Sequence, residues 1–167
     1  AQLALDQPEE ALKTVETGLR RHSKYAPLHE QLGRAYEALG QNWRLSTLPT
    51  YHRAIRLSPE TSFVSIQRSI AILQDNGRWH ECLVFIQDAQ KRLPNNRWLT
   101  AQYHAAKGHV FRHQQNWDQA LGSFIRALQI LPDLWQVYDA IAHTLHQTNR
   151  PVPTGSATSP RTFCELP

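Results

Sequence analysis

The 167-residue sequence is poor in the residues and motifs on which enzyme active sites and disulfide-bonded domains usually depend. It has two cysteines and no methionine. Two cysteines outside any spaced cluster form neither a disulfide framework nor a zinc signature, and this usage is compatible with a reducing, cytoplasmic compartment. We find no glycine-rich phosphate loop, no nucleophile elbow and no carboxylate pair suited to acid–base catalysis. The sequence therefore predicts a protein that has no catalytic activity of its own and needs no cofactor.

Charge and long apolar runs are also scarce. Charged residues make up 19% of the chain, and the net charge is +4. The basic residues are scattered one or two to a predicted helix, as on ordinary solvated helix faces, so we do not expect nucleic acid as a partner. No apolar run approaches the roughly 18 residues of a membrane span, so we expect no membrane partner either. The chain starts at Ala1 rather than at a methionine, so we expect that its native start is missing and that a signal peptide could have been lost.

The sequence does contain a pattern that occurs three times. Each copy runs from a tryptophan, through a helix of small and apolar residues, to a proline, and an alanine lies five residues before that proline. The three copies are Trp43 to Pro59 with Ala54, Trp79 to Pro94 with Ala89, and Trp117 to Pro132 with Ala127. The prolines are 35 and 38 residues apart. A period of this length is typical of a solenoid of stacked helix pairs, in which no unit buries its apolar face alone.

The spacing of apolar residues indicates helix through most of the first 150 positions. Proline and glycine place the ends of eight helices, at 8–21, 27–39, 47–57, 63–74, 78–92, 99–113, 117–131 and 134–148. We therefore predict an all-α domain over residues 1–150, with three helix pairs between two single helices, and a flexible tail rich in Pro, Ser and Thr over 151–167.

Two places depart from the repeat. The second unit has an extra residue on each side of Trp43, and Pro49 would break its second helix if that helix started as early as in the other units. We therefore expect a longer loop around Trp43 and a late helix with Pro49 in its first turn. About one extra helical turn is expected at 97–100.

The repeats resemble the tetratricopeptide repeat family, whose unit has a large residue, Leu-Gly and an aromatic in the first helix, then Ala and an aromatic, then Pro. The matching segments are His29-x2-Leu32-Gly33-x2-Tyr36, His104-x2-Lys107-Gly108-x2-Phe111 and Ala120-x3-Phe124-x2-Ala127 before Pro132. Small residues let two helix backbones approach, and the aromatics fill the space between neighbouring pairs. The resemblance covers about 150 residues and implies a right-handed α-α superhelix. A different helical repeat or an irregular bundle is the alternative.

The resemblance also implies a concave groove, lined by the first helix of each pair, that holds an extended or helical segment of a protein partner. The residues that the resemblance places in this groove are Glu30, Arg34, Glu37, Gln67, Ala71, Gln74, Gln102, Ala105, His109, Arg112, His113, Gln136, Asp139, His143 and His146. An ordinary solvated helix face is the alternative interpretation of this polar surface. Chaperone-binding members of the family share a lysine and asparagine clamp for a C-terminal carboxylate, and that clamp is missing here.

Histidines offer the only candidates for chemistry in this groove. His109 and His113 are four residues apart, and His143 and His146 are three apart, so each pair could approach a metal ion. Only Asp139 lies near enough in sequence to complete such a site, so no metal is expected. A groove that becomes positive below about pH 6.5 is the other possibility.

Two functions remain open at this point. The first is a non-enzymatic scaffold that binds a protein segment in the groove. The second is a docking or regulatory part of a larger enzyme such as a glycosyltransferase, since repeats of this family are often fused to transferases. On the last helix, Tyr138, Ala142 and Leu145 would face a missing partner, so self-association is a further possibility, unless Phe163 and Leu166 of the tail cover this stripe.

Overall fold

The computed structural model describes residues 8–148, and every regular element in this range is helical. The elements are α1 (Pro8–Arg21), α2 (Ala26–Ala38), the π-helical turn η1 (Trp43–Thr47), α3 (Leu48–Leu57), α4 (Phe63–Asp75), α5 (Trp79–Arg92), α6 (Arg97–His113), α7 (Trp117–Ile130) and α8 (Trp135–Gln147). The all-α prediction is confirmed, and each predicted helix end lies within two residues of the observed one. The predicted tail, with Phe163 and Leu166, lies outside the described residues.

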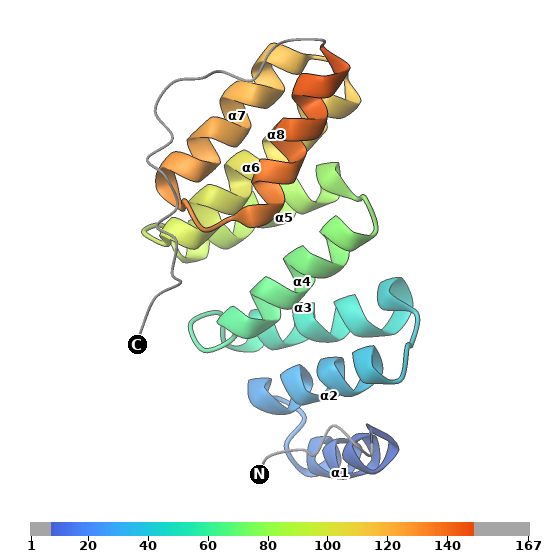
Figure 1. Ribbon diagram of the computed structural model, residues 1–167. Helices are drawn as coiled ribbons and strands as arrows, with labels where there is room; N and C mark the ends of the chain where they lie inside the picture. Colours follow the sequence, from blue (N-terminus) through green and yellow to red (C-terminus); the bar gives the residue numbers. More distant parts are fainter. Residues whose placement is uncertain (1–7, 149–167) are drawn as a thin grey trace, which may run out of the picture.

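The helices stack in chain order from α1 at one end to α7 and α8 at the other (Figure 1). All the extensive contacts join elements that follow one another in the sequence or, for α2 and α3, are separated only by the short turn η1, and a smaller contact joins α6 to α8. This pattern of neighbour contacts is the one expected of a helical solenoid, in which each unit packs only on the next. None of the helices within residues 8–148 combines the length and the apolar character that crossing a membrane requires.

The same backbone turn connects the two helices of each pair. The chain leaves the first helix through a residue with positive φ, which is Gly40 (63°), Gly77 (65°) and Gln115 (59°) in the three pairs. In each turn the next N–H donates to the carbonyl five residues back: Gln41 to Tyr36, Arg78 to Leu73 and Asn116 to Phe111, at 2.9, 2.7 and 2.9 Å. Such a left-handed turn satisfies carbonyl groups at the end of a helix. The repeat seen in the sequence is therefore also a repeat of backbone hydrogen bonds.

Within two of the pairs, a glycine of the first helix lies directly against an aromatic ring of the second. A Cβ atom on Gly33 would lie 2.6 Å from the Tyr51 ring, and one on Gly108 would lie 2.5 Å from the Phe124 ring. Tyr51 and Phe124 are both fully buried. The middle pair has no such glycine–aromatic contact, because Ile70 takes the place of the glycine and Ile86 takes the place of the aromatic residue. Ile70 and Ile86 belong to one buried core cluster there.

The two predicted irregularities have local explanations. The extra residues around position 43 form the π-helical turn η1 rather than the longer loop that we expected, and the side chain of Asn42 accepts hydrogen bonds from the N–H groups of Arg44 and Leu45. A π turn absorbs an inserted residue without opening the chain into a loop. The prediction for Pro49 is confirmed, because it lies in the first turn of α3. The extra turn of α6 is also confirmed, and Asn96 caps it by accepting from Leu99 N–H at 3.0 Å.

The contact between Gly108 and Phe124 makes a testable prediction. Gly108→Ala should lower the free energy of unfolding by about 1–3 kcal/mol, because the new methyl group overlaps a buried ring that has no free space. Gly122→Ala is the matched control. A Cβ at Gly122 meets nothing within 4 Å, so this change should raise stability by about 0.5–1 kcal/mol. Urea denaturation of both variants measures the difference, and equal stabilities would contradict the close packing.

Candidate functional site

The best-organised part of the predicted groove lies between α2 and α4. Glu37 of α2 accepts a hydrogen bond from the Tyr51 hydroxyl at 2.6 Å and another from Arg68 Nε at 3.1 Å. Arg68 also forms an ion pair through Nη2 with the second carboxylate oxygen of Glu37. Both oxygens of Glu37 are therefore occupied, and one glutamate joins α2, α3 and α4.

The environment of Tyr51 keeps this network in one protonation state. Burial of the ring, and then the nearby Glu37 carboxylate, raise the pKa of Tyr51 well above its ordinary value of 10. The hydroxyl therefore remains a hydrogen-bond donor at any physiological pH. The hydrogen bond to Glu37 likewise raises the pKa of Arg68, which stays charged. Tyr51 and Arg68 therefore both keep the protons that they donate to Glu37 in the physiological pH range.

A second acidic residue of α2 is also held by α4. Glu30 accepts a hydrogen bond from Ser65 Oγ at 3.0 Å, and its other oxygen lies 3.3 Å from Arg34 Nη2. The Glu30 side chain is 15% exposed, whereas that of Arg34 is 49% exposed. Pairs of this kind between exposed residues four apart on a helix are weak. Arg34 therefore keeps most of its positive charge available to solvent.

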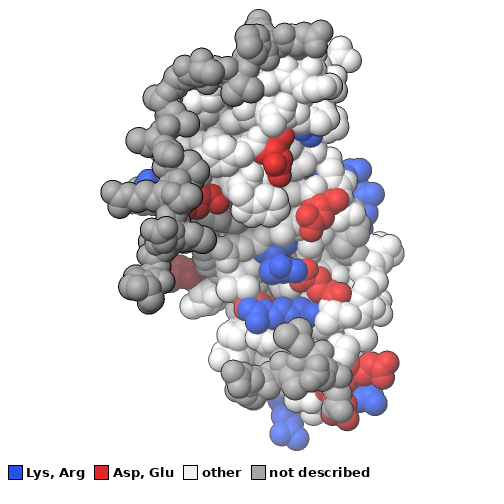
Figure 2. All heavy atoms as spheres, viewed as in Figure 1, with Lys and Arg blue, Asp and Glu red and all other residues white. Residues whose placement is uncertain are grey.

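These side chains surround a hollow of about 440 Å³, which we call the α2–α4 hollow. It is lined by Arg34, Glu37, Ala38, Val64 and Arg68. Figure 2 shows basic and acidic side chains close together over this part of the stack. The guanidinium groups of Arg34 and Arg68 border the hollow, and the aliphatic side chains of Ala38 and Val64 supply its apolar part. Arg34 and Glu37 were predicted as groove residues, whereas Val64 and Arg68 were not. Their spacing of four residues on a helix that also carries groove residues is the signal that could have found them.

The structure places the predicted groove residues of α6 differently. Gln102 is only 8% exposed and accepts a hydrogen bond from Gln74 Nε2 at 2.9 Å, so these two amides join α4 to α6. Ala105 is buried as well. His109 stacks on the Trp79 ring with centroids 3.6 Å apart, and it makes a T-shaped contact with the Phe124 ring, whose centroid is 5.1 Å away. These three residues connect neighbouring units, so they do not line an open groove together with Arg34 and Glu37.

This packing also bears on the pH-sensitive groove that the sequence suggested at His109. Burial, together with the positive charges of Arg112 and His113, lowers the pKa of His109 to about 3. The ring is therefore neutral well below pH 6.5, and it cannot supply the positive charge that a pH-sensitive groove would need there. No group of three His, Cys, Asp or Glu side chains between residues 8 and 148 is arranged to hold a metal ion.

The remaining predicted residues are more open. Gln67, Ala71 and Arg112 are half-buried, and the others are exposed: His113 on α6, and Gln136, Asp139, His143 and His146 on α8. Trp135 and Tyr138 of α8 are also exposed, by 65% and 51%.

The predicted apolar stripe on α8 is wrong in one member, because Leu145 is buried. Leu145 is one of the buried residues of α8, next to the buried Thr144, so it packs inward rather than on an outer stripe with Tyr138.

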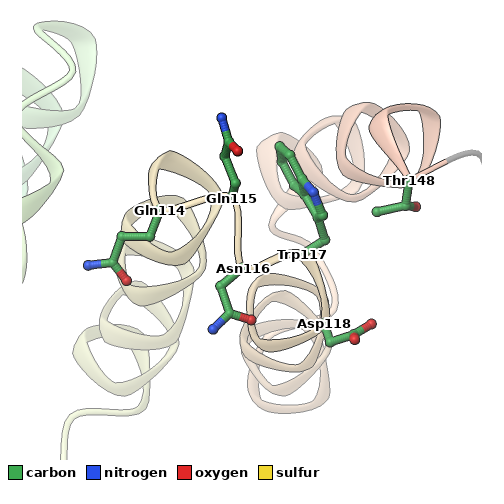
Figure 3. Close-up of a pocket in the computed structure, with 6 residues that line it drawn as sticks. All are labelled: Gln114, Gln115, Asn116, Trp117, Asp118 and Thr148. Carbon is green, nitrogen blue, oxygen red and sulfur yellow. The ribbon is translucent and has the colours of Figure 1, made fainter.

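Another hollow, at the turn between α6 and α7, has little chemical character. It measures about 660 Å³ and is lined by Gln114, Gln115, Asn116, Trp117, Asp118 and Thr148. Figure 3 shows that the amide side chains of Gln114, Gln115 and Asn116 point in different directions, while the Trp117 ring stands on the side of α8. Because these polar groups do not converge on a point, we do not place the functional site there.

Comparison with solved structures supports the repeat architecture. A MamA fragment from Desulfovibrio magneticus RS-1, running from its residue 41 to its end, matches with a TM-score of 0.64 and 17% identity, covering 86% of this chain and 77% of that one. A double mutant of MamA RS-1 matches with a TM-score of 0.63 and 17% identity, covering 85% and 76%. At such identity the likeness shows the fold alone, a helical-repeat architecture consistent with the tetratricopeptide type. No family model and no curated protein sequence matches the chain.

The lowered pKa of the half-buried His109 predicts a pH dependence of stability. Its folded pKa of about 3 lies below its unfolded value of about 6.5. The contribution of His109 to the free energy of unfolding is therefore fully present above pH 6.5 and is lost as the pH falls toward 3. The reason is that His109 takes up a proton in the unfolded chain at pH values where it does not in the folded chain. Burial also lowers the pKa of His52 and His104, which adds to the same trend.

The substitution His109→Phe removes the titrating imidazole but keeps an aromatic ring that can stack on Trp79. We expect the slope of the unfolding free energy against pH, between pH 4 and 6, to decrease by about 1 kcal/mol per pH unit. It should not vanish, since His52 and His104 remain. Urea denaturation at a series of pH values gives both slopes, and a variant with the wild-type slope would show that His109 titrates normally.

Proposed function

We propose that this chain is a non-catalytic binding module and that it holds a segment of a protein partner in the α2–α4 hollow. The observation that carries the proposal is the arrangement of its charges. Glu37 is neutralised by Arg68 and accepts a hydrogen bond from Tyr51, whereas Arg34 has one long contact with Glu30 and faces solvent. An acidic side chain that enters the hollow therefore meets an available guanidinium group, which binds carboxylates through paired hydrogen bonds.

The apolar part of the hollow defines the second requirement on the partner. Ala38 and Val64 offer aliphatic surface beside Arg34, and burying such surface contributes about 25 cal/mol per Å². The preferred segment therefore carries an aspartate or glutamate close to an aliphatic residue. Because Tyr51 and Arg68 already fix Glu37, the hollow needs little reorganisation before binding, which lowers the entropic cost of association.

A peptide selection tests this function. Random twelve-residue peptides displayed on phage are selected against the immobilised full chain, and the enriched peptides are synthesised and titrated by fluorescence polarisation. We expect acidic residues beside aliphatic ones to be enriched. Arg34→Gln should weaken the binding of these peptides about tenfold, which corresponds to the loss of about 1.4 kcal/mol, and Arg34→Glu should weaken it further.

Arg53→Glu is the matched control, because Arg53 is an exposed arginine on α3 that does not line the hollow. This variant should bind within about twofold of the wild type. Circular dichroism verifies that each variant is folded. Enriched peptides without acidic residues, or affinities that respond equally to changes at Arg34 and Arg53, would rule out the α2–α4 hollow as the binding site.

A further inference from the structure

A second pocket, between α6 and α7, has a different charge pattern. It measures about 330 Å³, and His104, Lys107 and Arg126 are among its lining residues. None of the described residues that line it is acidic. The α2–α4 hollow, by contrast, is lined by residues of both charges. This concentration of like charge is costly in the free protein, because the cations repel one another.

The two permanent cations of this pocket have no acidic partner. Within residues 8–148, no ion pair or hydrogen bond connects Lys107 or Arg126 to another side chain, although five other arginines form ion pairs: Arg34, Arg44, Arg68, Arg78 and Arg92. Lys107 Nζ lies 5.6 Å from the centre of the Phe111 ring, a cation–π contact that positions the ammonium group without neutralising it. Burial, followed by the charges of Arg126 and Lys107, lowers the pKa of His104.

The space in the pocket comes from a missing side chain. Gly122 lies in the middle of α7, and a Cβ built there would meet no atom within 4 Å. The Ser123 hydroxyl already donates to the Gln119 carbonyl at 2.8 Å, so it is not a free donor. The donors left for a ligand are those of Lys107, Arg126 and His104, with the amide of Gln119 at the border. Three of these four groups come from side chains that favour oxyanions.

We propose that the pocket between α6 and α7 binds a dianionic phosphate group. Two permanent positive charges without an acidic partner are balanced by a group of charge near −2, which phosphate monoesters carry at pH 7, and only half balanced by a carboxylate. Lysine supplies a point charge and arginine a planar fork, a combination suited to phosphate oxygens. This site is separate from the α2–α4 hollow, and it does not depend on the function proposed for that hollow.

Titration of the full chain with three probes tests the proposal. The probes are inorganic phosphate, O-phosphoserine and glutamate, with binding followed by ³¹P NMR or, for glutamate, by competition. We expect both phosphates to bind at the same site and glutamate to compete at least tenfold more weakly. A preference of tenfold or more for O-phosphoserine over inorganic phosphate would identify a phosphorylated side chain as the source, and equal binding would identify free phosphate. Glutamate that binds as tightly as phosphate, or no phosphate binding at 10 mM, would overturn the proposal.

Variants locate the site. The double variant Lys107→Gln/Arg126→Gln should lose at least tenfold in phosphate affinity, and Gly122→Leu should lose binding by filling the pocket without changing any charge. The control double variant Lys91→Gln/Arg53→Gln removes the same charge from exposed positions outside the pocket and should bind like the wild type. If this control loses as much affinity as the first double variant, the attraction is non-specific and the proposal is wrong.

The two proposals fail separately in these experiments. Arg34→Glu should leave phosphate binding unchanged, and Lys107→Gln/Arg126→Gln should leave the affinity for the selected peptides unchanged. A loss of one activity without the other therefore shows which of the two sites has been assigned incorrectly.

Discussion

The contact between a glycine on one helix and an aromatic ring on its partner is the constraint on which this structure depends. Tyr51 can be fully buried against Gly33 only because that glycine has no side chain. The same contact brings the Tyr51 hydroxyl to Glu37 and so fixes the carboxylate that holds Arg68. At the other end of the stack, Gly108 and Phe124 make the equivalent contact. Helix packing and the position of the candidate binding residues therefore have one physical origin.

The two ends of the stack differ in electrostatics although they share this packing. Between α2 and α4 the charges are paired, and the available positive charge is that of Arg34. Between α6 and α7 the cations Lys107 and Arg126 have no acidic partner in the described part of the chain. The middle pair, packed through isoleucines, separates these two regions. In a solenoid each unit contacts only its neighbours, so one unit can change its surface chemistry without disturbing the others.

Prediction from the sequence succeeded for features that are set by residues close in sequence. It failed for features that depend on contacts between neighbouring repeat units. Proline and glycine set the helix ends directly, so eight helices and the position of Pro49 were predictable. The π turn η1 was not, because an inserted residue can be absorbed as a loop or as a wider turn. Among the predicted groove residues, Arg34 lines the α2–α4 hollow, whereas the ring of His109 packs on Trp79 and Phe124. The sequence period alone does not show which rings will meet across units.

The most direct test of the central claim is a chemical-shift map of peptide binding. The full chain, labelled with ¹⁵N, is titrated with the tightest selected peptide, and amide shifts are followed by residue. Binding in the α2–α4 hollow predicts the largest changes at Arg34, Ala38, Val64 and Arg68, with little change on the exposed sides of α3 and α5. Largest changes on α3 and α5, or changes confined to α8, would contradict the claim that the glycine–aromatic packing builds the binding site between α2 and α4.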